Sequence, residues 1–133
     1  MKKKNCVFCK ISKMDWLKSN ELACAVLDAN PVTPFHVLII PKRHVESYFD
    51  LTNGETASCN VLLKEMKKWI LKKDPTVTGF NVGVNQGEDA GQTIEHCHIH
   101  LIPRRKGDVE NPEGGVRHLI AGRGYYGKEK NAR

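Results

Sequence analysis

Three of the six histidines in this chain occupy alternate positions within five residues, in the stretch GQTIEHCHIHLIP at residues 91–103. The side chains of a β-strand alternate between its two faces, and each residue advances the strand by about 3.3 Å. We therefore expect His96, His98 and His100 on one face of a strand, about 6–7 Å apart. The residues between and after them would point into the core: Cys97, Ile99 and Leu101. Such a strand holds a row of imidazoles on one face while the sheet packs on the other.

Other apolar runs predict the sheet to which this strand belongs. Short runs rich in branched residues and bounded by turn-forming residues are typical of strands. Together with the histidine strand they make four candidates: residues 21–28, 36–41, 79–85 and 96–104. The loop between the last two is short enough for antiparallel pairing, and the run at 36–41 suits a strand buried on both faces.

One long helix is predicted between the second and third of these strands. Thr52 and Glu55 have the spacing of a capping box, in which each side chain satisfies an unpaired amide of the first helical turn. Apolar residues then recur at helical spacing until Asp74-Pro75 ends the run: Val61, Leu62, Met66, Trp69 and Ile70. An antiparallel sheet with a helix on one side is an α+β fold. We expect one domain over residues 1–133, with a glycine-rich and partly irregular tail.

Size and charge limit the location and the ligands. The chain of 133 residues contains no apolar run of about 20 residues, the length that a membrane-spanning helix needs. Its basic start at residues 1–5 is not followed by the apolar stretch of a secretory signal, so we expect a cytoplasmic protein without a membrane partner. The net charge of +6 favours anionic ligands such as nucleotides, nucleic acid or phosphorylated metabolites, without selecting among them.

The five cysteines fall into two groups. Their odd number, in a chain without an export signal, argues against a disulfide framework. Three have apolar neighbours in sequence and are expected in the core: Cys24, Cys59 and Cys97. Cys6 and Cys9 form a Cys-x-x-Cys pair, which has the spacing of a metal-binding or a redox motif, and the spacing alone does not decide between the two.

The histidine row is consistent with two kinds of chemistry. Alternate histidines can ligate a catalytic zinc ion, as in hydrolases where three nitrogen ligands leave one position open for water. Alternatively, one imidazole can act as a nucleophile while its neighbours orient it and donate protons. The preceding residues favour the second chemistry, because a glycine-containing loop with Gln92 and Thr93 can offer backbone amides and a hydroxyl to phosphate oxygens.

Several segments of the chain match one known set of motifs. A His-x-His-x-His pattern follows Gly91-Gln92-Thr93, and an apolar block extends over residues 27–31 and 36–45. Residues 84–87 form a short asparagine loop, and residues 103–108 follow the histidine row. Together these motifs resemble the histidine-triad (HIT) family of nucleotide hydrolases and transferases. The last of them is similar to the segment after the triad in Fhit-like dinucleoside polyphosphate hydrolases.

The resemblance covers about residues 6–108 and leaves the tail at 109–133 unassigned. It implies a HIT-like α+β fold with an antiparallel sheet of about five strands, one long helix and a short N-terminal helix or turn. Family members are typically twofold dimers, so the resemblance also implies a homodimer.

The resemblance further implies a role for each matching residue. His98 matches the nucleophile, which would attack the α-phosphorus of a nucleotide and form a nucleotidyl-histidine intermediate. His100 would donate to the phosphate, and His36 matches a fourth histidine of the catalytic group. The remaining matches would bind the nucleotide: Asp28 at the ribose hydroxyls, Asn85, Gln92 and Thr93 at the phosphates or leaving group, and Gly91 where the backbone approaches the ligand. The implied substrates are dinucleoside polyphosphates with adenine or another purine as base, and no organic cofactor is implied.

A metal site is also implied by the resemblance. In the zinc-binding relatives, a Cys-x-x-Cys pair joins one histidine after the second strand and one at the first position of the triad. The matching residues here are Cys6, Cys9, His44 and His96. Two thiolates and two imidazoles would make a closed tetrahedral site, with one structural zinc ion per chain.

Three other functions stay open at this point. A purine nucleoside phosphoramidase would use the same residues with a different leaving group. A non-catalytic zinc-bearing module would bind a nucleotide or RNA, but a complete triad with Gln92 and Thr93 exceeds what binding requires, and we expect no dedicated nucleic-acid partner. A catalytic zinc ion on His96, His98 and His100 is the third alternative.

Overall fold

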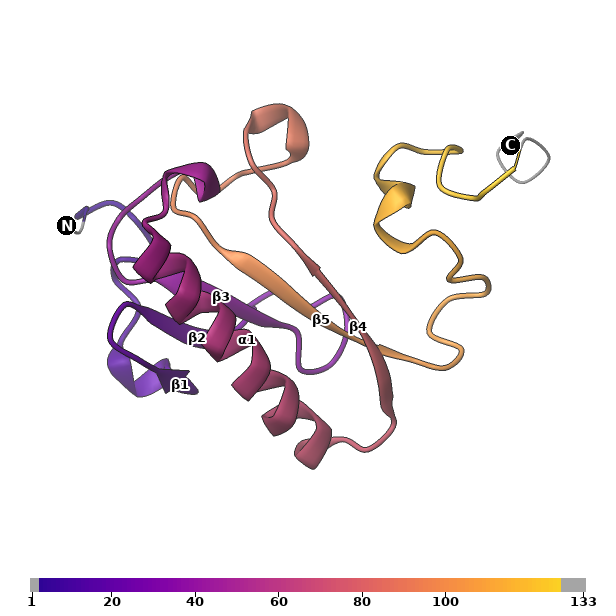
Figure 1. Ribbon diagram of the computed structural model, residues 1–133, viewed down its shortest axis with the longest axis horizontal. Coiled ribbons are helices and arrows are strands. Elements are labelled where there is room, and N and C mark those ends of the chain that lie inside the picture. The colour runs from indigo at the N-terminus through magenta and orange to yellow at the C-terminus, as the bar shows by residue number, and fades with distance from the viewer. Residues whose placement is uncertain (1–2, 128–133) are drawn as a thin grey trace.

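The core of the protein is a five-stranded antiparallel sheet with one long helix across one of its faces (Figure 1). The computed structural model describes residues 3–127. The strands lie in the order β1-β2-β3-β5-β4: β1 (Lys18–Ser19), β2 (Ala23–Leu27), β3 (Val37–Pro41), β4 (Val77–Gly83) and β5 (Ile99–Arg105). The helix α1 (Asn53–Lys73) connects β3 to β4. The α+β class is therefore confirmed, and the predicted short N-terminal helix or turn is a single 3-10 turn at Lys13–Asp15.

Helix α1 begins with the predicted capping box. The Thr52 hydroxyl accepts a hydrogen bond from the Glu55 amide, and the Glu55 carboxylate accepts one from the Thr52 amide. The helix ends at Lys73, with Asp74 as its C-cap. Its buried stripe consists of Glu55, Cys59, Leu62, Met66 and Ile70. Val61 is 49% exposed, because each helical residue is rotated by about 100° from the next and residue 61 therefore lies outside that stripe.

Strand β3 is buried on both of its faces, as its branched residues predict. Val37 and Ile39 pack with helix α1 in the main core. Leu38 and Ile40 face the opposite side, where they meet a second apolar cluster covered by residues from the N-terminal segment: Phe8, Ile11 and Trp16. The N-terminal segment thus forms a second layer on the sheet, on the face away from the helix.

Strand β5 begins at Ile99, so the prediction of a strand over residues 96–104 is wrong at its start. Only His100 belongs to the ladder, where it pairs with Leu38 of β3. His96 and His98 precede the ladder because the Cys97 amide donates to the carbonyl of Val45, in the loop after β3. The rings of His98 and His100 are 5.1 Å apart between centroids, which is closer than the predicted 6–7 Å. The burial of the intervening residues agrees with the prediction: Cys97, Ile99 and Leu101.

The segment after β5 lies beyond strand β4 and away from the helix layer (Figure 1). Between residues 106 and 127 it forms one 3-10 turn at Gly115–Leu119 and no strand. The rest of the predicted tail, residues 128–133, lies outside the described part of the chain, as do residues 1–2. Among residues 3–127, no helix has both the length and the apolar character that crossing a bilayer requires.

Candidate active site and metal centre

His98 lines a cavity of about 620 Å³ and is held in one tautomer by the main chain. Its Nδ1 lies 2.8 Å from the carbonyl oxygen of His96. Because a carbonyl oxygen can only accept a hydrogen bond, Nδ1 of the neutral ring carries the hydrogen and Nε2 carries the lone pair. The side chain is only 8% exposed, so few other orientations are open to it. His98 therefore presents the atom that a nucleophilic imidazole uses.

His36 and His100 form a hydrogen-bonded pair whose tautomers follow from the backbone in the same way. The amide of Val32 donates to Nδ1 of His36 over 3.2 Å, so the hydrogen of the His36 ring is on Nε2. That nitrogen lies 2.9 Å from Nδ1 of His100 and donates to it. The hydrogen of the His100 ring is consequently on Nε2, which is buried and has no hydrogen-bond partner within residues 3–127. His100, which lines the cavity, thus carries a hydrogen that no described group accepts.

Burial keeps this histidine pair neutral. It lowers the pKa of His36, and the nearby carboxylate of Asp28 opposes this effect. Burial also lowers the pKa of His100, helped by the charges of His98 and His36 and opposed again by Asp28. Neutral rings near pH 7 are consistent with the hydrogen-bond directions deduced from the geometry.

Asp28 lies against the histidine pair, but the three residues are arranged as a hydrogen-bonded group. Its Oδ2 is 3.4 Å from His36 Nε2 and 3.9 Å from His100 Nδ1. The ligand atoms of this trio are close enough together to hold a metal ion. However, His36 would have to give up the hydrogen on Nε2 while Nδ1 still accepts from Val32, which would make the ring an anion. The arrangement therefore favours a hydrogen-bond relay over a metal site.

The wall of the cavity is apolar on one part and polar on another. The apolar lining residues include Phe8, Ile11, Val26, Leu27 and Leu38. Phe8 packs edge-on against His98, with ring centroids 4.9 Å apart and an interplanar angle of 75°. A cavity of this size, mainly apolar with a few convergent polar groups, is typical of a small-molecule site.

The structure brings most of the predicted nucleotide-binding residues into this cavity. Its lining includes Asp28, Asn85, Gly91, Thr93, His98 and His100. His36 is 2% exposed and lies behind His100, which it contacts directly. Gly91 has a φ of +92°, a left-handed conformation that favours glycine, and a Cβ added there would meet no atom within 4 Å. The backbone at this position is therefore open to a ligand.

Gln92 is not among the lining residues, because its side chain is engaged in the loop itself. Its amide oxygen accepts from the Gly87 amide over 2.9 Å. Its amide nitrogen donates to the carbonyls of Glu46 and Ile94, each over 3.1 Å. These bonds tie the loop before the histidines to the segment after β3. In this conformation Gln92 positions the loop that carries Gly91 and Thr93.

Phe8 and Ile11 line the cavity, which the sequence analysis did not predict. Phe8 is one of the two residues between Cys6 and Cys9, and its side chain contacts His98. The signal was present in the Cys-x-x-Cys spacing, since a site that holds both cysteines near His96 must also bring the intervening residues to the same place.

The four predicted metal ligands converge in the structure. Their ligand atoms all lie within 4.8 Å of one another. The Sγ of Cys6 lies 3.3 Å from Nδ1 of His96, and the Sγ of Cys9 lies 3.3 Å from Nδ1 of His44. Zinc bond lengths of about 2.3 Å to sulfur and 2.0–2.1 Å to nitrogen place tetrahedral ligand atoms about 3.6 Å apart. The geometry of this group therefore fits a four-coordinate zinc ion.

His96 is prepared for metal binding by its second ring nitrogen. Its Nε2 lies 2.8 Å from the carbonyl oxygen of Pro41 and donates to it, which leaves the lone pair on Nδ1, facing the cysteines. Metal-ligating histidines commonly use their other ring nitrogen in this way. The main-chain carbonyl of His96 also accepts the hydrogen bond from Nδ1 of His98, a residue that lines the cavity. His96 therefore connects the four-residue Cys/His group to His98.

Comparison with known proteins agrees with this site. A family model described as the HIT domain matches residues 12–107. The chain is 44% identical over 87 residues to the nitrilase and fragile histidine triad fusion protein NitFhit of Caenorhabditis elegans, covering 65% of this chain and 20% of that protein. It is 36% identical over 88 residues to the asymmetrical bis(5'-nucleosyl)-tetraphosphatase of Schizosaccharomyces pombe, covering 66% of this chain and 48% of that protein. The match thus spans about a fifth and about half of the two relatives.

A solved structure shows the same fold with a metal. The zinc-bound histidine triad family protein from Mycobacterium smegmatis is similar to this chain with a TM-score of 0.70 and 31% identity, over 78% of each chain.

Proposed function

This chain belongs to the HIT domain family, and on that premise we propose that it hydrolyses dinucleoside polyphosphates at the α-phosphorus, with His98 as the nucleophile. One observation carries the proposal: His98 and His100 line the same cavity with ring centroids 5.1 Å apart, and their hydrogen bonds leave a lone pair on His98 Nε2 and a hydrogen on His100 Nε2. Covalent phosphoryl transfer needs a nucleophile and a donor next to each other. The tetraphosphatase name of the Schizosaccharomyces pombe relative supports this substrate class.

In the first step, Nε2 of His98 bonds to the α-phosphorus while the bond from phosphorus to the leaving phosphate oxygen breaks. That oxygen keeps the electron pair, and the rest of the polyphosphate departs. Nε2 of His100 donates a hydrogen bond to a phosphoryl oxygen and stabilises the negative charge on that oxygen. The ring of His98 becomes positively charged, and the carbonyl of His96 that accepts from Nδ1 stabilises this cation.

In the second step, water attacks the same phosphorus. The oxygen of water bonds to phosphorus, the bond to His98 breaks, and the lone pair returns to Nε2. A nucleoside monophosphate leaves, and the proton of the water passes to solvent. His36 acts as a positioning residue throughout, because it keeps the hydrogen of His100 on the nitrogen that faces the substrate.

The cavity walls provide separate places for the parts of one nucleotide. The apolar residues around Phe8 and Ile11 suit a purine ring, and Asp28 would accept hydrogen bonds from the ribose hydroxyls. Asn85, Thr93 and the open backbone at Gly91 would contact the phosphates. Gln92 would contribute by holding that loop in place.

A zinc ion would complete the four-ligand group of Cys6, Cys9, His44 and His96. When bound, it supplies a cross-link between the N-terminal arm and the residue next to the nucleophile segment, and with four protein ligands it has no open position for water. Because His96 would be a ligand of this four-coordinate site, a catalytic zinc ion shared by the three alternate histidines is disfavoured.

The protein would act as a homodimer in the cytoplasm. Strand β4 lies at the end of the sheet, and within the described residues it pairs only with β5. A long strand at an edge offers unpaired backbone groups to another chain. Nothing in the cavity requires a nucleic-acid partner, since its lining suits a single nucleotide.

The test is to trap the intermediate. Zinc-loaded protein is mixed with diadenosine tetraphosphate, quenched with alkali within milliseconds to seconds, and analysed by intact-protein mass spectrometry. One added adenylyl group per chain is expected, and none in His98→Ala, which should still bind nucleotide. Turnover by His98→Ala, or an adduct on another residue, would reject the assignment.

Product analysis separates the alternatives. A phosphoramidase would prefer adenosine 5′-phosphoramidate to diadenosine tetraphosphate in kcat/KM. Binding of nucleotide without turnover of either compound would identify a binding module instead.

A further inference from the structure

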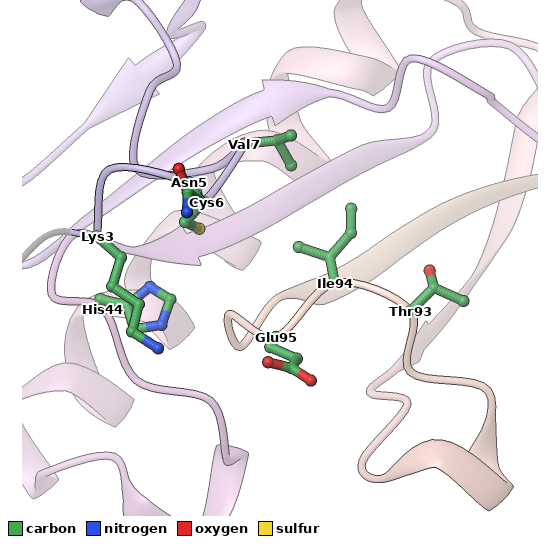
Figure 2. Close-up of a pocket in the computed structure, with 8 residues that line it drawn as sticks. All are labelled: Lys3, Asn5, Cys6, Val7, His44, Thr93, Ile94 and Glu95. Atoms are coloured by element: carbon green, nitrogen blue, oxygen red, sulfur yellow. The ribbon is translucent and has the colours of Figure 1, made fainter.

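A second hollow, of about 320 Å³, adjoins the cavity that His98 lines. Figure 2 shows that its walls come from three segments: the N-terminal arm, the loop before the histidines, and the loop after β3, which contributes His44. The lining residues are Lys3, Asn5, Cys6, Val7, His44, Thr93, Ile94 and Glu95. Of these residues only Cys6, His44 and Thr93 have a role in the proposed function, and the other five have none.

The hollow and the catalytic cavity share part of their walls. Val7, Thr93 and Ile94 line both. Thr93 belongs to the loop that would contact the phosphates, so the hollow adjoins the phosphate end of the proposed nucleotide site. A substrate that extends past the α-phosphorus in this direction enters the hollow.

We propose that this hollow binds the leaving half of a dinucleoside polyphosphate, that is, the second nucleoside with its adjoining phosphates. The inference rests on the proposed function and deepens it. Lys3 would bind phosphate oxygens, and Glu95 would accept hydrogen bonds from ribose hydroxyls. Val7 and Ile94 offer apolar surface to the base. The volume lies at the lower end of the range for ligand pockets.

The positive charge of Lys3 would stabilise the leaving group of the proposed reaction. When His98 displaces the leaving group, the bond from the α-phosphorus to the bridging oxygen breaks and that oxygen retains the electron pair. The departing polyphosphate thus gains negative charge next to the shared wall. The Lys3 ammonium is free to move toward it, because its side chain is 63% exposed and its ion pair with Glu46 is a long one of 4.0 Å. A phosphoramidate releases only a small amine, for which no such hollow is needed.

The experiment compares two substrates that share the adenylyl half. Zinc-loaded full-length protein is assayed with diadenosine tetraphosphate and with adenosine 5′-phosphoramidate, and the ratio of the two kcat/KM values is measured. Lys3→Glu is expected to lower this ratio about fivefold through a higher KM for the dinucleotide, as expected for an exposed charge contact. Glu95→Gln is expected to lower it about two- to threefold by weakening the hydrogen bonds to the ribose.

The matched control is Lys10→Glu, which makes the same change in charge on the same arm at an exposed residue outside the linings of both cavities. An unchanged ratio in this control, with a lowered ratio in Lys3→Glu, supports local contact. Equal changes in both lysine variants, or no change in Lys3→Glu and Glu95→Gln, overturn the inference while the proposed function stands. If the unmodified protein turns over neither substrate, the proposed function fails and this inference fails with it.

Discussion

A neutral imidazole has one nitrogen that carries a hydrogen and one that carries a lone pair, and its neighbours decide which is which. In this chain main-chain groups fix the tautomers of the three histidines at the cavity, two directly and the third through a neighbouring histidine. A carbonyl accepts from His98, and an amide donates to His36, which in turn sets His100. The chemistry of the site therefore depends on the local path of the backbone as much as on the histidines.

The relay from His36 to His100 leads to a kinetic prediction. In His36→Phe the ring packing is retained but no hydrogen is donated to His100 Nδ1, so the hydrogen on Nε2 is no longer enforced. We expect kcat to fall about 10- to 100-fold with little change in KM, as for other residues that orient a functional group from behind. Steady-state kinetics with diadenosine tetraphosphate measure this.

His118→Phe is the matched control for the relay, because His118 is an exposed histidine in the tail. Its kcat should equal that of the unmodified protein. A rise in KM without a fall in kcat for His36→Phe would assign His36 to substrate binding instead.

At the scale of elements, the start of helix α1 is tied to the loop that carries a metal ligand. Arg43 donates two hydrogen bonds to the Glu55 carboxylate, over 2.9 Å and 2.8 Å. The same carboxylate closes the capping box with Thr52. Arg43 immediately precedes His44, so the first turn of α1 is linked to a residue of the proposed metal site.

This contact makes stability depend on acid pH. Hydrogen bonds from Arg43 lower the pKa of Glu55 from 4.5 to about 2. A carboxyl whose folded pKa is depressed contributes stability above its unfolded pKa and loses it as the pH falls through the folded value. We expect the contribution to disappear between about pH 4.5 and 2. Since the Arg43 side chain is 42% exposed, its size should be about 1–2 kcal/mol.

Glu55→Gln isolates this effect. Denaturant unfolding at pH 7 and at about pH 2.5 should show a lower free energy of unfolding for the variant at neutral pH and a smaller difference in acid. Protonation of the buried histidines affects both proteins equally and cancels. A difference that does not shrink in acid would show that the carboxylate charge is not responsible.

The N-terminal arm leads to a prediction about metal content. Elemental analysis should find one zinc ion per chain, and Cys9→Ser should lose it together with several degrees of thermal stability, because the site cross-links the arm to the sheet. Cys24→Ala, which changes a buried cysteine away from the cluster, should keep its zinc. Retention of zinc by Cys9→Ser would remove Cys9 from the ligand set.

Local patterns predicted the elements well, and non-local contacts account for what they missed. The capping box and the branched run at β3 act over a few residues, so the sequence alone indicates them. The start of β5 depends on a bond between Cys97 and Val45, and the role of Gln92 depends on a bond to Glu46. Each of these bonds spans about 50 residues of chain, which no periodicity within a strand or helix reveals.

For the whole molecule, the position of β4 at the end of the sheet predicts the assembly state. Strand β4 contains no lysine or proline of the kind that discourages pairing at an edge. We expect sedimentation analysis to show a dimer, and Val82→Lys on β4 to shift it toward monomer. Val61→Lys is the control, because Val61 on helix α1 has the same exposure of 49%. A monomer at micromolar concentration in the unmodified protein would contradict pairing through this edge.

Every amino acid has a main-chain carbonyl. The group that orients the His98 ring therefore survives any substitution at residue 96 that leaves the path of the backbone unchanged. The metal ligand at that position, in contrast, belongs to a side chain that one substitution removes. Loss of the proposed zinc cross-link and loss of the proposed nucleophile would therefore be separable events. A descendant of this chain can discard the first and retain the second, provided that the main chain keeps its course.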